Sequence, residues 1–69
     1  MKISARNHWT GTIKHVVKGP VSTEVTIVVA GGLEVVAVIS THSAEALGLA
    51  VGKAAHALVK ASSVIVATE

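Results

Sequence analysis

Apolar side chains recur along much of this chain with a period of two, which is the period of a β-strand. The first such segment, residues 2–18, predicts either a pair of strands or one long, bent strand. Gly11 interrupts the pattern there and indicates a bulge or the bend of a barrel strand. Residues 21–30 alternate more cleanly, with Val25 and Ile27 on one face, and predict a second strand.

Glycines separate this second strand from a third. Gly31 and Gly32 predict a two-residue hairpin, because both positions accept positive φ without a steric penalty from a Cβ atom. The third strand is expected over residues 33–40. Its second face carries Val36 and Val38, and apolar side chains on both faces of a strand indicate cover by another subunit.

Residues 41–48 depart from the β pattern and predict one short helical turn, with a hydroxyl N-cap, an acidic residue in the first turn and a glycine at the end. Residues 53–60 alternate again, and an apolar run over residues 64–67 predicts a last strand. These elements predict an all-β fold, a small five-stranded OB-like barrel with one helical turn. Because no linker or internal repeat interrupts residues 1–69, we expect a single domain.

Composition strengthens the β prediction and raises a question of stability. Val, Ile and Thr make up 24 of the 69 residues, and hydrophobic residues make up 51%, which excludes a disordered chain. A chain this short buries only about 60% of its unfolded surface, so an isolated monomer is marginal. The chain has no cysteine, which removes disulfides and thiolate metal sites as supports. We therefore expect association to stabilise the fold.

Charge and aromatic content argue against nucleic-acid and membrane partners. The net charge is only +2, from six Lys and Arg residues and four acids. Trp9 is the only aromatic residue of the Phe, Trp and Tyr class, so the stacking surface of a single-strand-binding barrel is missing. No segment resembles a signal peptide or approaches the ~20 apolar residues of a membrane span. We expect a cytoplasmic protein.

Catalytic and metal-binding patterns are weak. Ser43 stands beside His42 and near Glu45, but a serine at a helix start is more simply a capping or ligand hydroxyl, so we expect no enzyme. The four histidines, at positions 8, 15, 42 and 56, match no local zinc pattern such as two His at i and i+4. We expect no directly coordinated metal cation.

Hydroxyl and basic side chains gather instead at the ends of the predicted strands. They are Ser4, Arg6, Ser40, Ser43, Lys60 and Ser62. Two interpretations stay open at this point. In the first, these side chains converge on a bound anion. In the second, they are solvated strand ends, and the basic ends belong to an oligomeric interaction module that docks an acidic partner.

An ordered set of short motifs covers nearly the whole chain. They are residues 1–7 (MKISARN), Gly11, Lys18-Gly19, Glu24-Val25, residues 39–43 (ISTHS), residues 47–49 (LGL) with Gly52, and residues 60–64 (KASSV). In these motifs, most specifically Ser-Ala-Arg-Asn, the chain resembles the molbindins, molybdenum-pterin-binding proteins with a single TOBE domain. The resemblance implies an OB-like barrel assembled as a homohexamer, a trimer of strand-exchanged dimers. It also implies binding of molybdate or tungstate between subunits, for storage or homeostasis, without a catalytic cofactor.

The resemblance further implies which residues bind the oxyanion. The principal site would consist of Ser4, the Ala5 backbone amide, Arg6 and Lys60, with Ser62 as an additional donor and with Ser40 and Ser43 supplied by a neighbouring chain. A second site near a threefold axis would involve Lys18, Gly19, Val21 and Ser22. Pro20 weakens this second assignment, because proline has no backbone N–H to donate.

The chemistry of these segments agrees with an oxyanion ligand. Arg6 and Lys60 supply positive charge, hydroxyls and amides supply further donors, and no Asp or Glu is present to accept a proton from the ligand. Such a site selects fully deprotonated dianions and rejects hydrogen phosphate. Molybdate, tungstate and sulfate have the same charge, so discrimination against sulfate depends on pocket size.

Overall fold

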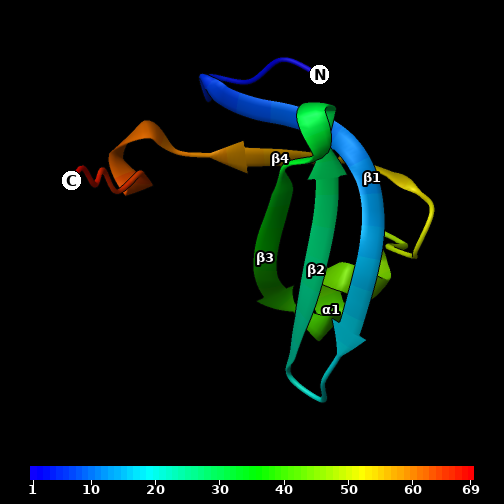
Figure 1. The fold of residues 1–69 in the computed structure, drawn as a ribbon. Coiled ribbons are helices and arrows are strands. Elements are labelled where there is room, and N and C mark those ends of the chain that lie inside the picture. The colour runs from blue at the N-terminus through cyan, green and yellow to red at the C-terminus, as the bar shows by residue number, and fades with distance from the viewer.

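The computed structural model describes all 69 residues and contains one antiparallel sheet of four strands (Figure 1). Its elements are β1 (Asn7–Lys18), β2 (Ser22–Val29), η1 (Ala30–Gly32), β3 (Glu34–Ser40), α1 (Thr41–Ala46), β4 (Ala54–Val59) and η2 (Ala61–Ser63). The strand order is β3-β2-β1-β4. β3 and β4 do not pair with each other, so the sheet curls without closing into a barrel.

β1 is one long, bent strand rather than a strand pair, which selects the second of the two interpretations of residues 2–18. Gly11 pairs with Val29 on one side and with Ala55 on the other. A Cβ atom on Gly11 would overlap the carbonyl oxygen of Val28, so glycine is required by the close approach of β2. The irregularity in the β1–β2 register lies between Ile13 and His15, which places the bulge away from Gly11.

The core is small and follows the predicted alternation of β2. Val25, Ile27 and Val29 point to the same side and pack with Ile13 of β1 and Ala57 of β4. Only nine of the 69 residues are buried. A core of this size supports the expectation that a single chain needs further apolar cover.

The β2–β3 connection differs in length from the predicted two-residue hairpin. Gly31 and Gly32 do adopt positive φ, 83° and 82°. The connection nevertheless spans four residues, 30–33, and is closed by a hydrogen bond of 2.9 Å from the Val29 N–H to the Leu33 carbonyl. The last β2–β3 pair is Val28 with Glu34, and the turn η1 occupies Ala30–Gly32 between the two strands.

The helical turn is present, with a shifted start. Ser40, the last residue of β3, is the N-cap, and its Oγ accepts a hydrogen bond from the Ser43 N–H. Glu45 therefore lies beyond the first turn of α1, although the sequence pattern predicts an acidic residue within that turn. Gly48 follows the helix with φ of 64°, as predicted for its end. No helix in the structure is long and apolar enough to cross a membrane.

The predicted fifth strand over residues 64–67 is wrong for the single chain. These residues leave the sheet after η2 (Figure 1). Ile65 and Val66 are 93% and 87% exposed. A strand forms only where a partner offers unpaired backbone groups, and this segment meets no sheet edge of its own chain. The fold is an open, four-stranded sheet instead of the expected five-stranded barrel.

Candidate oxyanion-binding site

An open pocket of about 550 Å³ lies between the N-terminal segment and the end of β4. Its seven lining residues are Ser4, Ala5, Arg6, Leu58, Lys60, Ala61 and Ser62. Five of these, namely Ser4, Ala5, Arg6, Lys60 and Ser62, are residues that the sequence predicts for the principal oxyanion site. The structure thus brings together two segments that are more than fifty residues apart in the chain.

The sheet register explains why these segments meet. β1 and β4 are antiparallel, and Asn7 at the start of β1 pairs with Val59 at the end of β4. Arg6 precedes Asn7 and Lys60 follows Val59, so this pairing places Arg6 beside Lys60. The turn η2 begins directly afterwards, with a hydrogen bond of 2.8 Å from the Ser63 N–H to the Lys60 carbonyl, and holds Ser62 at the same pocket.

The pocket is electropositive. Arg6 and Lys60 are its only charged lining residues, and both are exposed. The two ion pairs of the chain, Lys14–Glu34 and Lys18–Glu45, involve neither of them. A guanidinium with a fork of N–H donors and an ammonium with three donors are thus both free to contact an anion.

One chain encloses the pocket only partly. A tetrahedral oxyanion occupies about 120 Å³ if each of its four oxygens takes roughly the 30 Å³ of a water molecule. The open volume of about 550 Å³ is several times larger. Residues 4–6 and 60–62 can therefore contact one side of such an ion and leave its other side for additional donors.

Ser40 and Ser43 lie at the opposite end of the sheet from this pocket. Ser40 pairs with Ser22 at the start of β2, whereas the pocket adjoins the start of β1. The Ser40 Oγ donates to the Ser43 Oγ at 2.7 Å and accepts from the Ser43 N–H at 3.0 Å. This arrangement leaves the hydroxyl proton of Ser43 free to donate to another group.

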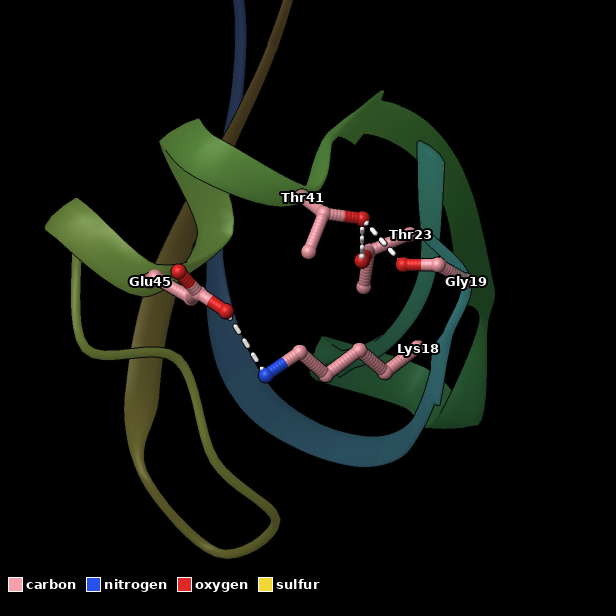
Figure 2. A network of polar contacts seen from close by, with 5 residues as sticks. All are labelled: Lys18, Gly19, Thr23, Thr41 and Glu45. Atoms are coloured by element: carbon pink, nitrogen blue, oxygen red, sulfur yellow. Dashed lines mark hydrogen bonds and ion pairs between the residues drawn. The ribbon is translucent and has the colours of Figure 1, made fainter. Parts of the chain in front are cut away.

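The residues predicted for a second site do cluster, at the β1–β2 turn. Several of their polar groups already have partners within the chain. The Gly19 N–H donates to the Ser22 carbonyl at 2.9 Å, and the Thr41 N–H donates to the Val21 carbonyl at 2.8 Å. Lys18 Nζ lies 2.7 Å from a carboxylate oxygen of Glu45 (Figure 2). The positive charge needed for an anion is therefore paired at this turn.

Two threonines join the same turn to the helix (Figure 2). The buried Thr41 hydroxyl donates to the Gly19 carbonyl at 2.7 Å, which leaves its oxygen to accept from the Thr23 hydroxyl at 2.8 Å. Sequence reasoning missed this network and the role of Glu45. Neither shows a local signal, because each contact joins residues 18 or more positions apart.

The arrangement considered for catalysis is not assembled. Ser43 bonds to Ser40, and Glu45 forms an ion pair with Lys18. None of the three side chains of His42, Ser43 and Glu45 hydrogen-bonds to another of the three. The pocket at residues 4–6 and 58–62 itself presents hydroxyl donors and two cations.

Comparisons with known proteins agree with this chemistry. Residues 3–66 match the family model of the TOBE domain. The chain is 39% identical over 66 residues to molybdenum-pterin-binding protein 2 of Clostridium pasteurianum, a match that covers 96% of this chain and 97% of that protein. It is 45% identical over 69 residues to the molybdenum transport protein ModE of Herbaspirillum seropedicae. That match covers all of this chain and 26% of the relative, so the chain spans about a quarter of its length.

Solved structures show the same fold. MopII from Clostridium pasteurianum superposes with a TM-score of 0.93 at 37% identity, over 97% of this chain and 100% of that chain. The cytoplasmic molybdate-binding protein ModG, in a form with molybdate bound, superposes with a TM-score of 0.90 at 42% identity, over 94% of this chain and 46% of that chain. This chain belongs to the TOBE domain family and, within it, to the molybdenum-pterin-binding (Mop) proteins.

Proposed function

We propose that this chain binds molybdate or tungstate, stores these oxyanions or buffers their free concentration, and catalyses no reaction. The observation that carries the proposal is the pocket in which Arg6 and Lys60 face the same space without a carboxylate partner. The names of its relatives, which include molybdenum-pterin-binding and molybdate-binding proteins, support the choice of ligand. In this proposal residues 1–69 act as one oxyanion-binding domain.

We further propose that the ligand binds between chains of a homo-oligomer, a hexamer built as a trimer of dimers. The open pocket and the remote position of Ser40 and Ser43 support this, since two chains together would supply donors on both sides of the ion. The exposure of Val36 and Val38, 59% and 67%, supports it independently, because these side chains lie on a strand with no apolar cover.

Exchange of the C-terminal segment is the proposed way in which two chains join. A groove of about 400 Å³ is bordered by residues of β2, β3 and β4, and eight of its nine lining residues are hydrophobic. Residues 64–67 of the same chain are apolar and unpaired. In a dimer, this segment from one chain would cover the groove of the other and form the fifth strand of its barrel.

The second oxyanion site, at Lys18, Gly19, Val21 and Ser22, is proposed as the weaker one. An anion there competes with Glu45 for the ammonium group of Lys18. Binding at this turn is therefore expected only after the principal site is filled.

We also propose a cytoplasmic location for this chain. The description of ModG as cytoplasmic supports it.

The experiment that tests the function is a calorimetric titration of the assembled protein with molybdate, tungstate, sulfate and hydrogen phosphate at equal ionic strength. We expect saturable binding of the two metal oxyanions and none of hydrogen phosphate, whose proton would face only donors. Similar binding of all four anions would indicate general charge attraction and favour a module that docks an acidic partner. Absence of molybdate binding would contradict the proposal.

A further inference from the structure

Two histidines that are distant in the sequence meet on the exposed surface of β1 and β4. His8 Nε2 lies 2.9 Å from His56 Nδ1, and the two ring centroids are 5.0 Å apart. The register explains this contact. Thr10 of β1 pairs directly with His56 of β4. His8 lies two residues before Thr10, on the same face of β1, and is therefore the diagonal neighbour of His56. Thr10 Oγ1 is also within 3.3 Å of His56 Nδ1.

The contact places two potential metal ligands at a shared point. A hydrogen bond between two imidazole nitrogens uses one N–H and one lone pair, so a single proton occupies the space between them. When a cation takes this place, the proton moves to the other nitrogen of its own ring by a change of tautomer, and two nitrogen lone pairs then face the cation. Imidazole nitrogen is a preferred ligand of zinc, copper and nickel.

The separation of the nitrogens lets both of them reach one cation. The two rings are exposed, so small rotations turn their lone pairs from each other toward a metal about 2.05 Å from each nitrogen. Two such imidazoles suit adjacent positions in the tetragonal or octahedral coordination of Cu²⁺ and Ni²⁺, and they also suit a zinc site.

We propose that His8 and His56 form a two-histidine site for a divalent transition-metal cation, with Cu²⁺ bound more tightly than Ni²⁺ or Zn²⁺. Cu²⁺ also has the highest affinity of the divalent first-row series for nitrogen ligands. The structure contains no group of three or more His, Cys, Asp or Glu residues that could hold a metal, so water fills the remaining positions. The Thr10 hydroxyl lies where it can hydrogen-bond to one such water.

This site is separate from the oxyanion pocket, because neither histidine lines that pocket. His56 does border the apolar groove proposed for the exchanged segment. The experiment therefore uses the assembled protein. Cu²⁺ is titrated into it in a non-coordinating buffer, with the emission of Trp9 as the signal, since Trp9 lies between His8 and Thr10 in β1.

The test compares His8→Gln, His56→Gln and the double variant with two controls, His15→Gln and His42→Gln, which remove exposed histidines elsewhere. Each site variant is expected to bind Cu²⁺ at least about tenfold more weakly than the parent protein. The reason is that the second histidine binds a Cu²⁺ ion already held by the first, and this gain is lost when either histidine is removed. The double variant should bind Cu²⁺ only slightly more weakly than either single variant. The two control variants should keep the parent affinity.

An unchanged Cu²⁺ affinity in the double variant, or an equal loss in His15→Gln, would overturn the proposal. Electron paramagnetic resonance of the parent protein with one equivalent of Cu²⁺ gives a second readout that does not depend on variants. Coupling to two imidazole nitrogens is expected. A spectrum with only oxygen ligands, or with one nitrogen, would contradict the site. Molybdate binding by the same variants shows separately whether the oxyanion function stands.

Discussion

At the scale of single residues, the proposed function rests on two cations, Arg6 and Lys60, that have no carboxylate partner. We expect Arg6→Ala and Lys60→Ala each to weaken molybdate binding about 10- to 150-fold, because a charge-assisted hydrogen bond contributes roughly 1.5 to 3 kcal/mol. Calorimetric titration of each variant measures this effect. His42→Ala is the control, since His42 lines no part of the pocket. An assembled Arg6→Ala protein that binds molybdate as tightly as the parent would show that the principal site is misassigned.

Glu45 offers a second test at this scale, because it neutralises the one cation of the proposed second site. Glu45→Gln should free Lys18 and strengthen oxyanion binding there by up to about fivefold, since an exposed ion pair contributes no more than about 1 kcal/mol. Glu34→Gln is the matched control, because it releases Lys14 from the other exposed ion pair. The number and affinity of bound molybdate ions, measured by calorimetry, should change only in the Glu45 variant. An identical gain in both variants would indicate a general effect of net charge.

At the scale of elements, Gly11 determines how closely β2 approaches β1. Gly11→Ala should lower the free energy of unfolding by about 2 to 3 kcal/mol, because the added methyl group overlaps the Val28 carbonyl and forces the strands apart. Urea denaturation at fixed protein concentration measures this loss. Gly31→Ala is the control, where no atom lies within 4 Å of the added Cβ and only the positive φ opposes it. We expect about 1 kcal/mol there, so equal losses at both glycines would contradict the role of close packing at Gly11.

At the scale of the whole molecule, the open groove and the exposed C-terminal segment predict an obligate oligomer. Sedimentation at micromolar concentration should show a hexamer and no folded monomer. Ile65→Asp should break this assembly, since it puts a charge on the segment that is proposed to cover the groove. Leu33→Asp, a change at a residue exposed in the β2–β3 connection, should leave assembly intact. A folded, monomeric parent protein would refute the proposal of strand exchange.

Ligand binding between chains should also stabilise the assembly. Molybdate at a hundredfold excess over its Kd is expected to add about 2.7 kcal/mol per site to the stability of the bound state. Thermal unfolding with and without molybdate, at several protein concentrations, measures this linkage. If molybdate raises the unfolding temperature but leaves dissociation of the hexamer on dilution unchanged, the site does not require a second chain.

Much of the local structure could be predicted because it depends on neighbouring residues. Alternation along β2 identified the strand and its buried face, since side chains of a strand point alternately to opposite sides. Positive φ at Gly31 and Gly32, and the helical turn before Gly48, followed from the same local rules. The resemblance to the molbindins also selected five residues that the structure places around one open pocket, and oxyanion binding by these residues stays a prediction.

Only the tertiary structure decided the features that depend on register and on a partner. The pairing of Asn7 with Val59 places Arg6 beside Lys60, and the same ladder brings His8 to His56. Nothing within a few residues of any of these positions specifies that register, which is set by the packing of whole strands. The missing fifth strand has the same physical reason. Residues 64–67 have the composition of a strand, but a strand exists only where another backbone is available to pair with it.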